Sequence, residues 1–582
     1  MPYRVGVSTG LYRAAGSEEL SDVLRKLGAG LTMGTAVIEL AQDYPHEILI
    51  SDGLKIRDMA KKQGVTLTSH GSLTVPIGIP ERGEWRDADD HLKKSIRSAV
   101  FAGAVYVNFH ASLREWLELM TYAGRKLTMI FCDHEGNFIS KVLQESENLR
   151  KWFVEKRWQD YYRSVLTEDE YHEAVSGADL EIEDRTRRRI EDEAQKLRRG
   201  EITPEQFEER RHDISRDESR RRAGILTGNI KTAMLKKFAG GERWDTEEIR
   251  GMISVIDGYH IMFHHLFYKK DKMLEAMAEM YPEIERRIDY GDFYWPDKAW
   301  EEAEKKNDRR FKEFFYAAVA AKYLEGHTKK AIEWMDTDLI KEIKALKLER
   351  EGDREKLLSA ARNMKLCFES PDARDPSVAG LYLLWSPRQI YAAIKTARKV
   401  LKTTRPMMLM DFEHVATQGI DPILDMEEVI KIAPDYGEYV LSVHCNPPNP
   451  LHSMQPIELG DIRVYQLLWF LRQTGFGKKR PGYLIFERGA AKDPYAKSVE
   501  TLKLCAEYLD KETHPDELPA EFFGMKGLVA GDIVRQRQII KDHFYEPIKD
   551  LLEMPEEEWG ALSQALVRAG KKPELWKKGE LR

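Results

Sequence analysis

Eight short apolar segments, most of them separated by stretches with a helical pattern, are the feature that most constrains the fold. Tyr3 to Ser8 is the first, and a helix predicted from its N-cap Ser17 to about Leu27 follows it. Strands that alternate with helices at this spacing are typical of βαβ units in a parallel sheet. The sequence therefore predicts an α/β protein, a closed (βα)8 TIM barrel with strands at 3–8, 36–40, 65–70, 105–110, 364–369, 407–411, 439–444 and 482–487.

The alternation is interrupted once, after the fourth predicted strand. Residues 127–336 are heavily charged and mostly helical in pattern, which favours an insertion domain with solvated charged faces. A hairpin from Leu127 to Ile139 is predicted to introduce it. His260 and His264 stand four residues apart there, and packing in an aromatic core is favoured over metal binding. The predicted domains are 1–126 and 337–505 for the two halves of the barrel, 127–336 for the helical insertion, and 506–582 for a helical C-terminal extension whose last helix opens at Pro555.

Composition narrows the class of protein. The 582 residues exceed a single core, and 42% hydrophobic residues suffice for folded domains. A net charge of -7 gives no general attraction for nucleic acid, so such a partner would need a local basic groove. The four cysteines lack paired spacing, and neither a secretory segment nor a membrane-spanning apolar run is recognised. We expect a cytoplasmic protein without membrane contact, and the oligomeric state stays open.

Metal-ligand residue types stand at the ends of six predicted strands. Alternate residues of a strand point to the same side, so the side chain of His70 lies on the same side as Thr66 and Thr68 and on the opposite side from Leu67. The carboxyl ends of barrel strands meet at one mouth, where active sites are built. Asp411 also precedes His414 by three residues. The strand-end residues predicted to converge are His70, His110, Glu369, Asp411, His444 and Glu487.

Three histidines and three carboxylates form a mixed nitrogen and oxygen set that suits Zn²⁺, Mn²⁺, Fe or Co²⁺ better than Ca²⁺. Converging carboxylates repel one another unless cations offset their charge. A central carboxylate such as Glu369 could bridge two ions, which suits hydrolysis of a phosphodiester. The same residues could polarise a sugar carbonyl and hydroxyl for a hydride or proton shift. A network of salt bridges without metal is the remaining alternative.

The strand ends resemble a known family. Over about residues 1–115 and 340–490 the chain is similar to the xylose-isomerase-like TIM-barrel superfamily, and within it to endonuclease IV-type apurinic/apyrimidinic endonucleases. The resemblance implies one zinc ion on His70, His110 and a bridging Glu369, and a second on Glu369, Asp411, His444 and Glu487, with His414 at a third. The motifs that carry it are Ser69-His70-Gly71, Asn108-Phe109-His110, Phe368-Glu369, Asp411-Phe412-Glu413-His414, Val443-His444-Cys445-Asn446 and Ile485-Phe486-Glu487.

The chain departs from that family after the seventh strand. Where the family has an Asp-x-His pair, this sequence has His452 and Met454, and a thioether is an unusual zinc ligand beside oxygens. Two ions are therefore expected, with His452 a candidate ligand only. The first hypothesis is a two-metal phosphodiester hydrolase, with abasic-site DNA among its substrates. The second is a sugar or sugar-phosphate isomerase or epimerase with one Mn²⁺ or Co²⁺, in which Glu369 and Glu487 handle protons and His414 holds substrate. The third is a non-catalytic module that uses the helical insertion as a partner platform.

Overall fold

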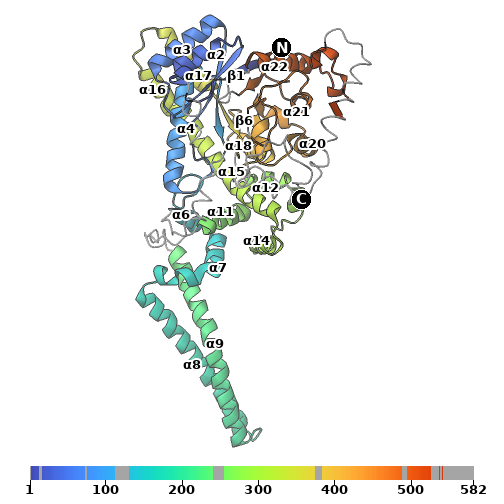
Figure 1. Ribbon diagram of the computed structural model, residues 1–582. Coiled ribbons are helices and arrows are strands. Elements are labelled where there is room, and N and C mark those ends of the chain that lie inside the picture. The colour runs from blue at the N-terminus through green and yellow to red at the C-terminus, as the bar shows by residue number, and fades with distance from the viewer. Residues whose placement is uncertain are drawn as a thin grey trace. The chain divides into compact units, whose positions relative to one another are not determined.

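The computed structural model describes residues 2–11, 16, 18–72, 75–111, 130–239, 255–373, 383–451, 454–487, 495–525, 537 and 540–541. Its central feature is a barrel of strands with helices around it (Figure 1). The barrel is closed and its strands are parallel and follow one another in sequence order, with β8 paired to β1. The predicted α/β barrel is thereby confirmed. The strands are β1 (Tyr3–Ser8), β2 (Val37–Ala41), β3 (Thr66–His70), β4 (Tyr106–His110), β5 (Lys365–Glu369), β6 (Pro406–Asp411), β7 (Val440–His444) and β8 (Gly482–Phe486).

A buried apolar layer fills the barrel. Tyr106 lies inside it, because its hydroxyl reaches Glu39 on β2 and Ser442 on β7. Gly6 allows β1 to approach β2, since a Cβ at this position would stand 2.6 Å from Cβ of Val37. The core cluster comes from six of the strands and contains Val37, Tyr106, Cys367, Met407, Leu409, Leu441, Tyr483 and Ile485.

The first barrel helix begins later than the sequence predicts. A single 3-10 turn (Glu18–Leu20) is followed by α2 (Val23–Leu31), and Asp22 caps that helix by accepting from the backbone N–H groups of Leu24 and Arg25. The predicted N-cap, Ser17, lies outside the described residues. The other helices around the barrel are α3 (Ile50–Gln63), α4 (Arg82–Ala102), α18 (Pro387–Val400), α20 (Pro422–Ile432), α21 (Ile462–Gln473) and α22 (Tyr495–Asp510).

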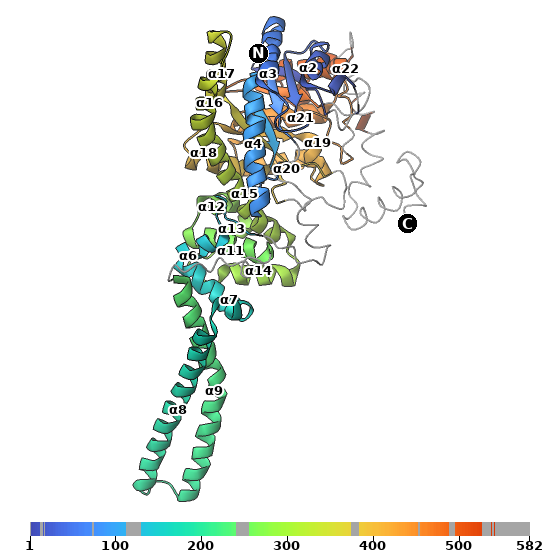
Figure 2. The ribbon, with the colours of Figure 1, turned by 90° about the vertical axis from the view of Figure 1, so that its left-hand side faces the viewer.

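The segment between β4 and β5 is helical, as predicted. Its hairpin is reduced to one antiparallel bridge between Cys132 and Phe138, and residues 127–129 lie outside the described ranges. Helices α8 and α9 run side by side as a long pair, and α9 also packs against α7 (Figure 2). The elements are α6 (Ile139–Glu145), α7 (Glu147–Val165), α8 (Glu168–Arg198), α9 (Pro204–Ala239), α11 (Val255–Lys269), α12 (Lys272–Glu279), α13 (Pro282–Glu285), α14 (Trp295–Lys306), α15 (Arg309–Trp334), the π-helical η2 (Met335–Leu339), α16 (Ile340–Ala345) and α17 (Glu351–Asn363).

Part of this helical segment completes the wall of the barrel. Helix α15 packs against α4 and α18, and α17 leads into β5. The predicted boundary at residue 336 falls within η2, and the one at residue 505 falls within α22. By its contacts the chain divides into two units, Met1–Glu458 with Ile462–Glu512 and Leu459–Asp461 with Thr513–Arg582. The predicted helix at Pro555 lies outside the described residues.

His260 and His264 lie in an aromatic cluster of the helical segment, as expected. The imidazole of His264 stacks on the indole of Trp152 with ring centroids 3.8 Å apart, and its Nε2 lies 3.5 Å from an oxygen of Asp297. His260 meets the ring of Trp300 edge-on at 4.7 Å. Burial lowers the pKa of His260 to about 4, which keeps this imidazole neutral within the cluster.

Candidate metal centre

The barrel mouth brings together seven of the eight predicted ligand residues. His452, the eighth, lies outside the described residues. In each of three groups the nitrogen and oxygen atoms lie within 4.8 Å of one another, and neighbouring groups share Glu369 or Asp411. The groups are His70, His110 and Glu369; Glu369, Asp411 and His444; and Asp411, His414 and Glu487.

Glu369 ends β5 and is completely buried between two of these groups. Its Oε1 lies 2.8 Å from Nε2 of His70 and 2.9 Å from Nε2 of His110. Its Oε2 has no hydrogen-bond partner within the described part of the chain, and Nδ1 of His444 lies 3.5 Å from it. The carboxylate thus faces histidines on both sides, and one of its oxygens is a buried acceptor without a donor.

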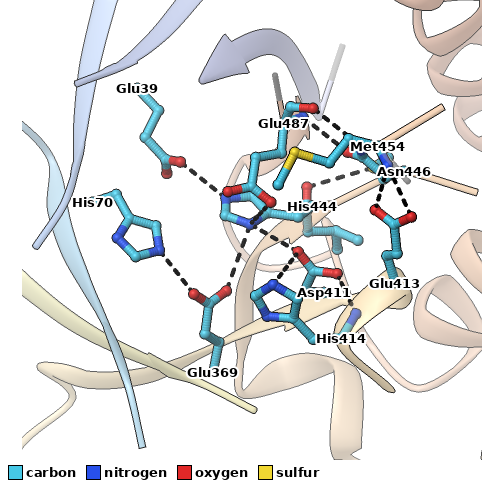
Figure 3. A network of polar contacts seen from close by, with 12 residues as sticks. Glu39, His70, Glu369, Asp411, Glu413, His414, His444, Asn446, Met454 and Glu487 are labelled. Atoms are coloured by element: carbon cyan, nitrogen blue, oxygen red, sulfur yellow. Dashed lines mark hydrogen bonds and ion pairs between the residues drawn. The ribbon is translucent and has the colours of Figure 1, made fainter. Parts of the chain in front are cut away.

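His444 ends β7, and three carboxylates converge on its Nδ1 (Figure 3). The nearest oxygens belong to Asp411 at 3.2 Å, Glu369 at 3.5 Å and Glu487 at 3.8 Å. A proton on Nδ1 can form a good hydrogen bond with only one of these oxygens. A cation beside Nδ1 would attract all three, because its field is not directional.

The far nitrogen of three imidazoles is fixed as a donor. In His70 and His414, Nδ1 lies 2.9 Å and 3.0 Å from the carbonyl oxygens of Gly71 and Ser370, and a carbonyl oxygen can only accept. In His444, Nε2 lies 2.9 Å from a carboxylate oxygen of Glu39. The neutral form of each ring therefore turns a lone pair toward the central carboxylates, which is the orientation that a metal-ligating histidine requires.

Asp411 serves the backbone and the site together. It is the N-cap of the short helix α19 (Phe412–Thr417), because its Oδ1 accepts from the backbone N–H of His414 at 2.8 Å. Its Oδ2 faces Nδ1 of His444 at 3.2 Å and Nε2 of His414 at 3.8 Å. Capping therefore uses one oxygen of this carboxylate and leaves the other facing the two histidines.

Without a bound ion, His70 and His444 hold protons, whereas burial lowers the pKa of His110. Burial lowers the pKa of His70, but the hydrogen bond and charge of Glu369 outweigh it and raise that pKa to about 9. His444 is likewise raised well above its ordinary value, since Glu39 and Asp411 outweigh its burial. Burial alone raises the pKa of Glu369, yet hydrogen bonds from His110 and His70 lower it well below the usual range. Glu369 is therefore ionised, and the protonated rings of His70 and His444 each face one of its two oxygens.

The donor set fits divalent transition-metal ions. Among the described residues, the ion pairs of these carboxylates involve histidine only, and no Lys or Arg compensates them. Imidazole nitrogens with carboxylate oxygens suit Zn²⁺, Mn²⁺, Fe²⁺ or Co²⁺. The orphaned Oε2 of Glu369 and the three oxygens around Nδ1 of His444 are the features that a bound cation would satisfy.

Glu39 is a site residue that the sequence analysis missed. It lies on β2, is completely buried, and contacts His444 through Oε1 and the hydroxyl of Tyr106 through Oε2. It stands two residues before the end of its strand, so a search of strand ends passes over it. The available signal was a carboxylate inside an otherwise apolar strand, in phase with the inward-facing Val37.

Two further polar residues shape the rim. Asn446 exchanges hydrogen bonds with the backbone of Glu487, each 2.9 Å long, and thereby fixes the chain after β8. Glu413 is buried and accepts from the backbone N–H of Met454 at 3.0 Å (Figure 3). This contact ties the segment after β7 to α19.

Of the described helices, none has the length and apolar character needed to cross a membrane. Comparison of the chain with models of protein families and with curated proteins found no match.

Proposed function

We propose that this protein is a metal-dependent hydrolase of phosphodiesters, of the endonuclease IV-like type, with two divalent ions at the barrel mouth. The observation that carries the proposal is Glu369, whose two oxygens face separate histidine groups. A shared carboxylate between two nitrogen-containing sites is what a two-metal centre requires.

The residues divide by depth. Asp411, Glu369 and His444 are completely buried and form the floor of the site. The side chains of His110 and Glu487 are 13% and 17% exposed, so they border the space from which a substrate enters. Divalent ions held there would polarise a phosphoryl oxygen and lower the pKa of water. Glu487 borders that space, His414 belongs to the same group of donor residues, and both can hold or accept a proton as the ester is cleaved.

The test combines metal analysis with hydrolysis. Wild-type protein, loaded with Zn²⁺ or Mn²⁺ and desalted, should retain two ions per chain and cleave bis(p-nitrophenyl) phosphate, with an abasic-site duplex as a second substrate. The Glu369→Gln variant lacks the negative charge between the two sites, so it should hydrolyse neither ester. Glu47→Gln is the matched control, because Glu47 is a buried carboxylate that pairs with Lys26. Retention of one ion with no hydrolysis of either ester would refute the proposal.

A sugar isomerase or epimerase is the second candidate. The group of Glu369, Asp411 and His444, with Glu487 3.8 Å from Nδ1 of His444, is by itself sufficient for one ion. In that case Glu369 and Glu487 would exchange protons with a sugar. Incorporation of deuterium from D₂O into an aldose or ketose, followed by NMR, distinguishes this reaction from ester hydrolysis.

A further inference from the structure

We propose that Glu39 is a positioning residue that orients His444 and strengthens it as a metal ligand. This inference rests on the metal centre of the proposed function, and it adds a residue that belongs to none of the three ligand groups. Glu39 Oε1 accepts from Nε2 of His444 at 2.9 Å, on the far side of the ring from the other carboxylates. The ring of His444 therefore separates Glu39, at Nε2, from the carboxylates of Asp411, Glu369 and Glu487, which face Nδ1.

The contact determines which nitrogen of His444 is available. Because a carboxylate only accepts, Nε2 must carry a proton, and the lone pair of the neutral ring is left on Nδ1. The negative charge of Glu39 also increases the electron density of the ring, which makes Nδ1 a better ligand. An amide at position 39 would preserve the hydrogen bond but not the charge.

The burial of Glu39 indicates that its charge has a use. Its relative exposure is zero, and among the described residues its only ion-pair partner is His444. Burying a carboxylate carries a free-energy cost that a positively charged partner must offset. Cations beyond Nδ1 of His444 would offset this cost through the ring. A purely structural role would be served equally well by a neutral acceptor.

Glu39 is itself oriented by hydrogen bonding to a neighbouring side chain. The hydroxyl of Tyr106 donates to Oε2 of Glu39 at 2.8 Å, and the oxygens of Tyr106 and Ser442 lie 2.9 Å apart. All of these side chains are buried inside the barrel. Tyr106→Phe removes one hydrogen bond of Glu39 and leaves its contact with His444, so it provides a graded companion to Glu39→Gln.

The experiment measures metal affinity in the absence of substrate. Zn²⁺ is titrated against a chromogenic chelator for the wild type, Glu39→Gln, Tyr106→Phe and the control Glu47→Gln. Urea unfolding of the metal-free proteins runs in parallel. Co²⁺-loaded samples supply visible spectra, which report the ligand field of the ion beside His444.

Glu39→Gln should weaken the binding of one of the two ions by roughly 10- to 100-fold and shift the Co²⁺ spectrum. Tyr106→Phe should have a smaller effect, and Glu47→Gln should lower stability without changing affinity. Unchanged affinity and spectrum in Glu39→Gln would overturn the inference, as would a wild type that binds no metal. A wild type that binds two ions but cleaves no phosphodiester would refute the proposed function and leave this inference standing.

Discussion

At the scale of single residues, protons and cations compete for the same lone pairs. The near nitrogens of His70 and His444 face ionised carboxylates, which raise the pKa of each histidine against the opposing effect of burial. The metal-free protein therefore carries protons where the proposed ions would bind. Metal binding must release those protons, so affinity is coupled to pH.

The sign of this coupling follows from His70, whose pKa is raised to about 9. Below that pH the ring holds a proton that an ion must displace, so affinity falls as pH falls. As the pH is lowered from 9 to 6, we expect the apparent Kd for Zn²⁺ to rise about tenfold per pH unit for each proton released on binding. Chelator competition at several pH values measures it, and buffers of different ionisation enthalpy count the protons. A Kd independent of pH in this window would contradict the assignment.

The residues of the site differ in how visible they are in the sequence. His70, His110, Glu369, Asp411 and His444 could be predicted because each ends a predicted strand, and all strand ends of a parallel barrel meet at one face. Glu39 and Asn446 could not be found by that reasoning. Glu39 acts from inside its strand, and Asn446 acts through backbone contacts that exist only when β7 and β8 lie together.

At the scale of elements, strands were easier to predict than helix starts. A buried parallel strand is an apolar run with abrupt ends, so the predicted bounds agree with the observed ones within one residue. The start of helix α18 agrees with the Ser386-Pro387 pair, which is typical of a helix N-terminus, and the side chain of Gln389 accepts there from the backbone N–H of Ser386. The start of α2 does not, because the cap at Asp22 was not distinguished from the one predicted at Ser17.

Helix α15 carries a buried histidine that makes the fold sensitive to acid. His327 is completely buried and stacks on Trp85 at 4.7 Å, and within the described structure neither of its ring nitrogens has a hydrogen-bond partner. Burial lowers its pKa to about 3. In the unfolded chain the ring takes up a proton below about pH 6.5, whereas the folded protein does not. Stability therefore falls as pH drops from 6.5 toward 3, by about 1.4 kcal/mol per pH unit.

His327→Phe keeps an aromatic ring against Trp85 and removes this proton. We expect the free energy of unfolding of this variant to depend less steeply on pH between 6 and 4 than that of the wild type. The difference in slope should correspond to the uptake of about one proton fewer on unfolding. Urea unfolding at several pH values measures the slope. The same substitution at the exposed His212 on α9 controls for the added ring. A slope equal to that of the wild type would show that His327 does not titrate differently in the two states.

At the scale of the whole molecule, the proposed ions should stabilise the barrel. They neutralise carboxylates contributed by strands as distant in sequence as β5 and β8, and a ligand that binds only the folded state adds stability by mass action. At a free ion concentration 1,000 times the Kd, the gain is about 4 kcal/mol. We expect EDTA to lower the unfolding temperature of the wild type by several degrees. Glu369→Gln should show no such shift, and an equal shift in both proteins would mean that the chelator acts elsewhere.

The pair of α8 and α9 should be separable from the centre. Its outer part is held by its own contacts, since buried Glu218 pairs with Arg185 and Arg189 across the two helices. Closer to α7, Asp179 pairs with Arg222, and Lys231 joins α9 to Glu155 of α7. A variant in which a glycine-rich turn replaces residues 183–218 removes Glu218 together with both of its helix α8 partners, and leaves the inner contacts.

We expect this variant to fold, to retain the same number of ions and to hydrolyse bis(p-nitrophenyl) phosphate with the kcat/KM of the full chain. Metal analysis after desalting and steady-state kinetics are the measurements. The physical reason is that the described donor residues lie on barrel strands, directly after β8 or, for His414, on α19, so their positions depend on the barrel and not on the helical pair. Loss of an ion, or of hydrolysis of this small ester, would show that the pair helps to build the site.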